Sequence, residues 1–317
     1  MTADNTLEEA MERCAREPIH VPSSIQPHGF LLVLDATDLC VLQASENVEQ
    51  WLGLPARELI GCQFTHLVSD GFDLCAQLAR IPDDEVFPFH IGDVRLRQGA
   101  PFSTPLHLLV HCHDDVLVAE LEPPRLPPDL AGQGDYYPLV RSFVGSLQPA
   151  SSLEDLLQQT VLQLKRITGF GRVKAYRFDA DGNGQVLAEV ADPGYPRYLG
   201  LCFPAADIPR QARELYRMNR IRVIEDANYQ PSPLHPATNP RTGKALDMSF
   251  ATLRSVSPVH LQYMRNMSTL ASMSLSIVVD GELWGLVSCH HQQPRAVDLR
   301  TRTACELLAS VLSLQIE

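Results

Sequence analysis

A segment rich in proline and glycine divides this chain of 317 residues into two parts. It runs from Glu122 to Gly134, contains two Pro-Pro pairs and shows no apolar periodicity. Proline lacks a backbone N–H group and fixes φ, so the segment cannot continue a helix or a central strand. A chain of this length is expected to hold about two domains. We therefore predict domains at 1–125 and 137–317, with 126–136 as the linker.

Short apolar runs separated by turn residues dominate the first part. Strands are expected at 30–34, 39–42, 86–97, 104–112 and 116–122. A short helix fits 47–52, because Gly53 is the residue type that most often ends one. The first part is thus predicted to be a mixed, mainly antiparallel sheet with short helices.

Helical and strand patterns alternate in the second part. Ser151 and Glu154 have the spacing of a capping box, an apolar stripe follows, and Gly169 is a natural C-cap. Further helices are expected over 207–218, from Ser257-Pro258 onward and over 298–317, with strands at 171–178, 184–191, 273–279 and 283–289. The chain as a whole is predicted to be an α+β protein with two domains.

One long segment of the second part lacks any regular pattern. Four prolines interrupt residues 225–250. An irregular stretch of this length inside a domain is usually functional or held by another part of the chain.

Charge and cysteine usage exclude several classes of protein. The formal net charge is −12, from 26 basic and 38 acidic residues, and no basic run is present, which argues against nucleic-acid binding. No apolar run is long enough to cross a bilayer. The eight cysteines are scattered and none forms a Cys-x-x-Cys pair, which favours reduced thiols. We expect a cytoplasmic protein without a membrane span.

Polar residues suited to an anionic, mostly apolar ligand cluster in the second part. Arg222 and Arg254 can each bind a carboxylate through paired hydrogen bonds, and Arg254 is followed at once by a predicted helix start. Ser272 and Ser274 lie on one face of a predicted strand and could donate to the same group. Exposed arginines and a wetted strand face are the alternatives.

A carboxylate and an imidazole suggest a nitrogen heterocycle, and a thiol suggests a covalent link. Asp207 and His260 could hold a protonated ring system, although Asp207 could instead cap its helix and His260 could be structural. Cys14 lies in a polar segment where a thiolate could react, or it could be a bystander. Together these residues suit a linear tetrapyrrole better than a metal or a nucleotide.

Metal and catalytic motifs are not indicated. His107, His111 and His113 fall on one strand face, but histidines at that spacing along a strand are widely spread, so no metal site is predicted. The sequence has no Gly-x-Ser-x-Gly elbow, Walker loop or His-Glu-x-x-His motif. No catalytic residues are predicted, and the chain is not expected to be an enzyme.

Five ordered motifs carry a resemblance to a known family. They are Cys14 to His20, Ser24 to Gly29, Pro204 to Pro209, Arg254 to His260 and Leu283 to His291. In these motifs the chain resembles the photosensory core of a bacteriophytochrome, from about residue 12 to the end. The resemblance implies a PAS domain followed by a GAF domain, with the segment around Ile25 threading the insert at 225–257 in a figure-of-eight knot.

The resemblance also implies a chromophore and the residues that hold it. The chromophore would be biliverdin IXα, attached by a thioether to Cys14. Asp207 and His260 would hold the pyrrole N–H groups. Carboxylate partners and lining residues would be Tyr176, Tyr198, Phe203, Ile208, Tyr216, Arg222, Arg254, Ser257, Tyr263, Met267, Ser272, Ser274 and His290.

The expected function is that of a red/far-red photoreceptor, in which light isomerises the chromophore at ring D. Such a protein could also fluoresce in the near infrared. Full-length relatives would add PHY and output domains, often a histidine kinase, and a homodimer through helices at 140–168 and 298–317. The alternative is a GAF sensor of a cyclic nucleotide or haem without photochemistry.

Lys174 departs from the family, whose members usually carry an apolar residue there, and so does Ala206. Cys202, beside Phe203, is a possible rival tether that strand alternation argues against.

Overall fold

The computed structural model describes residues 17–69, 72–79, 87–125, 141, 145 and 151–316. The chain divides into two compact units. The N-terminal unit combines His20–Pro124 with Tyr229–Ser257, and the C-terminal unit is built on Arg125–Asn228 and Pro258–Glu317. Cys14 and the expected linker at 126–136 lie outside the described residues. Among the residues described, no helix is long and apolar enough to cross a membrane.

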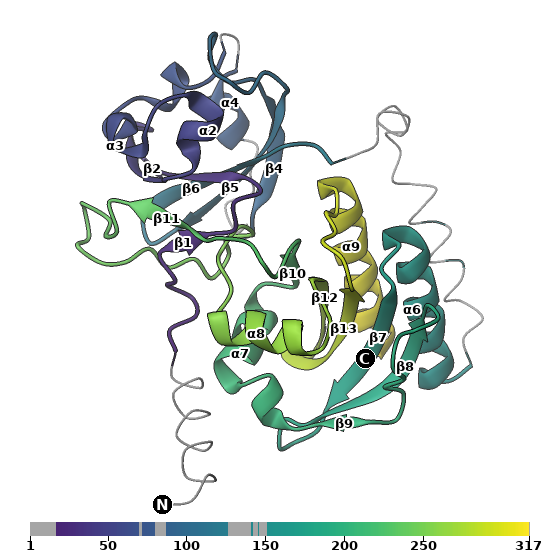
Figure 1. The fold of residues 1–317 in the computed structure, drawn as a ribbon. Helices are drawn as coiled ribbons and strands as arrows, with labels where there is room; N and C mark the ends of the chain where they lie inside the picture. Colours follow the sequence, from purple (N-terminus) through teal and green to yellow (C-terminus); the bar gives the residue numbers. More distant parts are fainter. Residues whose placement is uncertain are drawn as a thin grey trace, which may run out of the picture. The chain divides into compact units, whose positions relative to one another are not determined.

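The N-terminal unit is a seven-stranded antiparallel sheet with short helices on one face (Figure 1). The strand order is β1-β11-β3-β2-β6-β5-β4. The strands are β1 (Ser24–Ile25), β2 (Phe30–Asp35), β3 (Val41–Ser45), β4 (Phe89–Val94), β5 (Leu106–His113), β6 (Val116–Glu122) and β11 (Ser232–His235). The helices are α2 (Val48–Leu52), α3 (Ala56–Leu59), the 3-10 turn η1 (Phe64–His66) and α4 (Leu74–Leu78).

Both faces of this sheet are apolar. Successive side chains of a strand project from opposite faces, so a strand that is apolar throughout, such as β2, supplies both. Phe30, Leu32 and Leu34 of β2 enter the core beneath the helices. Leu31 and Val33 enter a second core, which apolar residues of the 229–257 segment cover. Gly53 ends α2 in the left-handed conformation, as the sequence predicts.

The irregular segment at 229–257 and the N-terminal segment complete the sheet together. β1 pairs with β11, which in turn pairs with β3. Ile25 forms an isolated bridge with Arg254, and the Gln26 backbone N–H donates to the Leu253 carbonyl oxygen at 2.7 Å. These contacts fit the expected association of the two segments; the knot itself stays a prediction.

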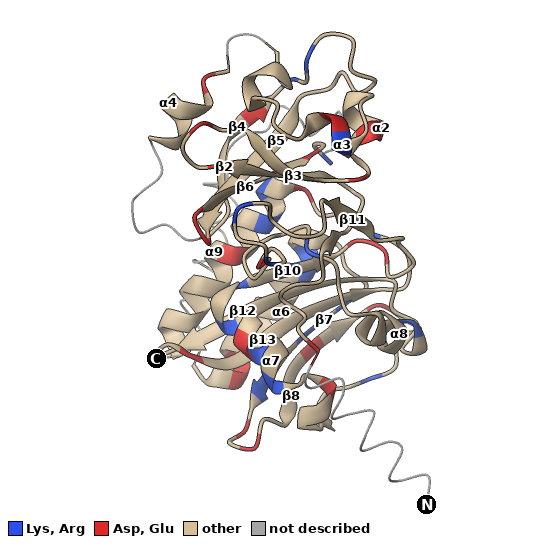
Figure 2. Ribbon diagram, turned by 90° about the vertical axis from the view of Figure 1, so that its left-hand side faces the viewer, with Lys and Arg blue, Asp and Glu red and all other residues tan. Residues whose placement is uncertain are grey.

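The C-terminal unit is a six-stranded antiparallel sheet in the order β10-β12-β13-β7-β8-β9. Its strands are β7 (Arg172–Phe178), β8 (Gly184–Ala191), β9 (Cys202–Phe203), β10 (Ile221–Ile224), β12 (Ala271–Val279) and β13 (Glu282–His291). Its helices are α6 (Leu153–Thr168), the 3-10 turn η2 (Ala205–Asp207), α7 (Arg210–Met218), α8 (Pro258–Asn266) and α9 (Leu299–Ile316). Helices α6 and α9 lie on one side of the sheet, with α7 and α8 on the other (Figure 1). Basic and acidic positions are interspersed along the ribbon (Figure 2).

Two local predictions in this unit need correction. The cap of α6 is Ser152, whose hydroxyl accepts from the Asp155 backbone N–H at 3.1 Å, so the capping box predicted for Ser151 and Glu154 is wrong by one residue. Gly169 ends α6 as predicted. Asp207 does not cap α7, because Pro209 occupies that position.

Candidate functional site

The face of the C-terminal sheet opposite α6 and α9 is polar. Ser274 of β12 pairs with Arg222 on one side and with Ser288 on the other, and Ser288 pairs with Lys174. Neighbouring side chains in such a row project from the same face, opposite the apolar core that contains Met273, Val287 and Val173. A second row on the same face joins Ser272, His290 and Arg172.

This polar face is nevertheless buried. Arg172, Lys174, Ser272, Ser274, Ser288 and His290 are all buried. Burial of polar groups costs free energy unless hydrogen-bond partners are present. The polar groups of this face therefore either stabilise the fold through hydrogen bonds within the protein or bind a ligand. The contacts of each side chain distinguish these two roles.

Aromatic side chains gather over one end of the face. They form a cluster with Val186 and Leu286 that contains the predicted site residues Tyr176, Tyr198, Phe203, Ile208 and Tyr216. Tyr198 and Phe203 meet edge to face, with 5.6 Å between ring centroids. The cluster supplies an apolar wall beside the polar rows.

His290 carries a buried ring nitrogen that the described residues do not satisfy. Its Nε2 lies 2.9 Å from the Ser288 hydroxyl, but its buried Nδ1 has no hydrogen-bond partner among the residues the structure describes. Burial, with the nearby Lys174 and Arg172 cations, lowers the pKa of His290 well below its usual value, so the ring is neutral. An unmade buried hydrogen bond costs about 1–3 kcal/mol, which makes Nδ1 a candidate ligand contact.

Asp207, Tyr263 and His260 meet close to the aromatic cluster, since Tyr263 and Asp207 both act on the pKa of Tyr176. The Tyr263 hydroxyl donates to Asp207 Oδ2 at 3.0 Å, and the rings of His260 and Tyr263 stack with centroids 6.1 Å apart. Burial raises the pKa of Tyr263, and the Asp207 carboxylate raises it further. Burial, followed by the charge of Arg222, lowers the pKa of His260 to about 4. The Asp207 carboxylate thus engages Tyr263 rather than the terminus of α7.

Arg172 is a site residue that our sequence analysis missed. Its Nε lies 3.3 Å from Glu189 Oε1, and its guanidinium donates to the Pro196 carbonyl oxygen. The Cζ atom of Arg172 lies 4.0 Å from the centroid of the Tyr198 ring. Strand alternation from Tyr176 back to Arg172 is the signal that could have revealed it. Arg172 anchors the loop that carries Tyr198.

Lys174 lies in the same strand and contacts the aromatic wall. Its Nζ is 4.5 Å from the Phe203 ring centroid and 4.9 Å from that of Tyr198. Burial lowers the pKa of Lys174 to about 8, and the Arg172 charge contributes, while Glu189 opposes the shift. The departure from the family noted in the sequence is therefore a buried cation inside the candidate site.

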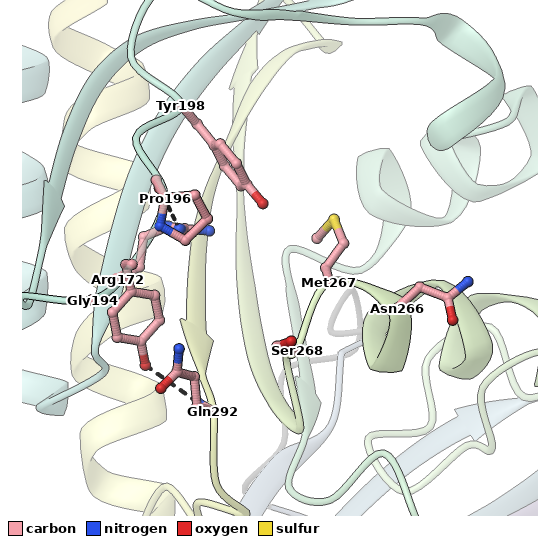
Figure 3. Close-up of a pocket in the computed structure, with 9 residues that line it drawn as sticks. Arg172, Gly194, Pro196, Tyr198, Asn266, Met267, Ser268 and Gln292 are labelled. Atoms are coloured by element: carbon pink, nitrogen blue, oxygen red, sulfur yellow. Dashed lines mark hydrogen bonds between the residues drawn. The ribbon is translucent and has the colours of Figure 1, made fainter.

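A cavity of about 360 Å³ opens beside these residues. Figure 3 shows Tyr198 and Met267 pointing toward each other across it, from the 194–198 loop and from the residue after α8. Ligand pockets usually span ~300–1,000 Å³, so this cavity has room for part of an extended ligand. Its lining consists of Arg172, Gly194, Tyr195, Pro196, Tyr198, Asn266, Met267, Ser268 and Gln292.

Most predicted site residues therefore come together on one unit. Arg254 and Ser257 belong to the N-terminal unit, and Cys14 lies outside the described residues, so their part in the site stays a prediction. Ser276, on the same strand face as Ser274, serves the fold, because its hydroxyl donates to the Tyr216 carbonyl oxygen at 2.6 Å. The arrangement can bind an anionic, mostly apolar ligand through cations, hydroxyls and two neutral imidazoles.

Comparisons with known proteins agree with the two-domain fold. A model of the PAS fold matches residues 14–124 and a model of the GAF domain matches residues 152–317. The chain is similar to cyanobacterial phytochrome B of a Nostoc species, at 38% identity over 96% of this chain and 40% of that protein. It is also similar to a bacteriophytochrome of Xanthomonas campestris, at 38% identity over 99% of this chain and 48% of that protein.

The chain spans a larger share of two solved structures than of these relatives. The wild-type chromophore-binding domain of Stigmatella aurantiaca phytochrome P1 matches with a TM-score of 0.88 and 41% identity, over 96% of this chain and 99% of that one. The chromophore-binding domain of RpBphP3 from R. palustris matches with a TM-score of 0.85 and 42% identity, over 96% of this chain and 97% of that one.

Proposed function

Because the chain belongs to the bacteriophytochrome family, as the PAS–GAF core, we propose that it is the bilin-binding, light-sensing part of a longer receptor. The chain spans less than half the length of the curated relatives it matches, 40% and 48% in the two cases above. PHY and output domains, such as a kinase, are thus part of the proposal for the whole protein. Location in the cytoplasm stays a prediction.

The observation that carries the proposal is the buried polar face and the unsatisfied Nδ1 of His290. A tetrapyrrole presents ring carbonyls, pyrrole N–H groups and two carboxylates on an otherwise apolar body. The face offers groups of complementary chemistry: a neutral imidazole, buried hydroxyls and the Arg222 cation beside Ser274. The residues present therefore fit a bilin.

Each group of residues has a defined task in this proposal. Arg222, Ser272 and Ser274 supply charge-assisted and neutral hydrogen bonds to carboxylates, and the part of Arg254 and Ser257 in carboxylate binding stays a prediction. Asp207 and His260 hold pyrrole N–H groups, with Tyr263 fixing the Asp207 side chain. His290 receives the ring that turns, within the wall formed by Tyr176, Tyr198, Phe203, Ile208, Tyr216 and Met267.

When bound, biliverdin would supply red-light absorption and a double bond that isomerises at ring D. The protein's contribution is to orient the ring, exclude water and leave room for one ring to rotate. The aromatic wall provides the apolar surroundings, and the lowered pKa of His290 keeps its imidazole neutral beside Lys174.

We propose Cys14 as the point of covalent attachment. Its sulfur would add to a vinyl group of the chromophore, forming a C–S bond while the thiol proton passes to the vinyl carbon. Cys202, the rival tether, is exposed on the short strand β9, whereas its neighbour Phe203 belongs to the aromatic cluster. Strand alternation therefore turns the Cys202 sulfur away from that cluster.

One experiment tests both binding and attachment. The apoprotein is mixed with biliverdin, its absorption is recorded before and after red illumination, and a denaturing gel is then stained with zinc to reveal bound bilin. The wild type and Cys202→Ala should show a red absorption band and a fluorescent gel band. Cys14→Ala should lose the gel band, because only the covalent link survives denaturation.

Two results would contradict the proposal. A fluorescent gel band that persists in Cys14→Ala removes the thioether assignment. A protein that stays colourless with biliverdin favours the GAF small-molecule sensor instead.

We also propose a homodimer formed through the helices of the C-terminal unit. Three leucines of these helices are exposed: Leu162 of α6 to 42%, and Leu307 and Leu314 of α9 to 47% and 72%. Burial of exposed leucines between two copies would remove apolar surface from water. Light scattering over a concentration series should show a mass of two chains, and Leu307→Glu should shift the mass toward one.

A further inference from the structure

A group of two imidazoles and one carboxylate lies in the N-terminal unit, separate from the proposed bilin site. Asp93 Oδ1 is 2.6 Å from His107 Nδ1 and 3.2 Å from His90 Nε2. The two imidazole rings meet edge to face with centroids 5.2 Å apart. One ligand atom from each of the three residues lies within 4.8 Å of the other two.

Pairing between strands brings these residues together. Asp93 of β4 is the direct partner of His107 of β5, so their side chains project from the same face. His90 lies three positions before Asp93, which in a regular strand would place it on the opposite face. A register shift between His90 and Gly92 inserts one residue and turns His90 toward Asp93.

The exposure of the three side chains differs in a useful way. The His107 side chain is 8% exposed and is fixed by its surroundings, whereas His90 and Asp93 are 39% and 50% exposed. One ligand is thus held rigidly, and two remain accessible to solvent. A metal ion could reach this group and keep water in its remaining coordination position.

From this geometry we propose that His90, Asp93 and His107 bind a divalent transition-metal ion of the zinc class. Imidazole and carboxylate ligands suit zinc, with bonds of about 2.0–2.2 Å, which places ligand atoms of a tetrahedral site about 3.3 Å apart. The His90–Asp93 separation of 3.2 Å already matches that spacing. The His107–Asp93 separation of 2.6 Å must open by about 0.7 Å as the metal replaces their hydrogen bond.

A metal ion binds a deprotonated carboxylate oxygen or the lone pair of a neutral imidazole nitrogen. Burial alone would raise the pKa of Asp93, but the hydrogen bonds and charges of His107 and His90 together outweigh it and lower that pKa. On binding, the proton between His107 Nδ1 and Asp93 moves to the other nitrogen of the ring.

The proposal differs from a site built on one strand. His107, His111 and His113 share a strand face, but His111 packs near Phe250 and has both ring nitrogens buried without a hydrogen-bond partner among the described residues. His113 instead faces Asp247 at 3.4 Å. His107 therefore finds its co-ligands on the neighbouring strand.

Zinc titration of the tag-free full chain tests this site, with the protein prepared without bilin so that pyrrole nitrogens do not take up the ion. Calorimetry with zinc chloride should show one ion bound per chain. His90→Ala and Asp93→Asn should each weaken binding at least ~tenfold, because loss of even an outer-shell contact typically costs 10–100-fold. These two side chains are exposed enough for both variants to fold, which a thermal melt verifies.

His66→Ala and His113→Ala are matched controls. His66 is an exposed histidine of the same unit, and His113 belongs to the other candidate cluster, with Asp114 and Asp247. Both controls should bind zinc like the wild type. The proposal is overturned if the wild type takes up no zinc, if binding is unchanged in both His90→Ala and Asp93→Asn, or if only His113→Ala abolishes it.

Discussion

The two sheets of this protein bury their second faces in different ways. In the N-terminal unit, residues 246–253 of the chain itself cover that face with apolar side chains. In the C-terminal unit, the corresponding face carries arginine, lysine, serine and histidine, and it is also buried. Each of the two antiparallel sheets thus packs one face against an apolar core beneath helices. The second face is apolar in the N-terminal sheet and polar in the C-terminal sheet.

Buried polar groups show the difference most clearly. Glu120, in the N-terminal sheet, accepts hydrogen bonds from the backbone N–H groups of Thr252 and Leu253 and from the Thr252 hydroxyl, at 3.1, 2.6 and 3.0 Å. His290, in the C-terminal sheet, leaves Nδ1 without a partner among the described residues. His111 is an exception in the N-terminal sheet, where its ring packs against Phe250. The comparison teaches that the chain itself covers one face with apolar side chains, whereas the other face buries cations, hydroxyls and an imidazole.

The largest expected effect concerns the buried ion pair of the C-terminal face. Arg172→Leu should lower the free energy of unfolding by about 3–5 kcal/mol, because Glu189 stays buried without its cation. Urea unfolding measures the change. Arg177→Leu, on the same strand but exposed, is the matched control and should change stability by less than about 0.5 kcal/mol. Equal losses in the two variants would show that burial of this face carries no special energetic role.

The N-terminal face should depend on Glu120 almost as strongly. Glu120→Ala leaves two backbone N–H groups buried without acceptors, at about 1–3 kcal/mol each, so a loss of about 2–5 kcal/mol is expected. Thermal and urea unfolding of the apoprotein provide the measurement. The exposed Glu46→Ala should be neutral. A neutral Glu120→Ala would break the comparison, because the face would then not need this contact.

Lys174 should act in the opposite direction. Its pKa is about 8 in the folded protein, against an ordinary value near 10.5, so below pH 8 the buried charge opposes folding. Lys174→Met should therefore raise the stability of the apoprotein at pH 7, by about 1–3 kcal/mol after loss of its aromatic contacts.

The pH dependence provides the sign check for Lys174. Between pH 8 and 10.5 the unfolded chain binds more protons at this residue than the folded chain, so its contribution to stability rises with pH in that window. The difference in stability between Lys174→Met and the wild type should shrink from pH 7.5 to pH 10. A constant difference would mean that the folded lysine has an ordinary pKa.

The smallest expected effect separates two serines of one strand. Ser276→Ala removes the hydrogen bond to the Tyr216 carbonyl oxygen and should cost about 1 kcal/mol in the apoprotein. Ser274→Ala should leave apoprotein stability nearly unchanged but weaken biliverdin binding, which a titration followed by absorption measures. The reverse pattern would reassign the two hydroxyls.

Much of the fold could be predicted from local patterns. Strand alternation and the Gly53 and Gly169 helix ends depend on neighbouring residues alone, and the structure has them. The capping box failed by one position because Ser151 and Ser152 are both capping residue types. Asp207 was ambiguous because a carboxylate before a helix suits a cap as well as a ligand, and the Tyr263 hydroxyl that engages it lies 56 residues away.

The sequence by itself determined the class of the chain, its two antiparallel sheets and most residues of the candidate site, because periodicity and motifs are local. Only the tertiary structure decided which residues share a row, since the register between strands depends on contacts distant in sequence. It placed Arg172 and Lys174 beside His290, and it joined His107 to Asp93 rather than to His111. The physical reason is that a side chain's chemistry is fixed by its type, but its partners are fixed by how the whole sheet packs.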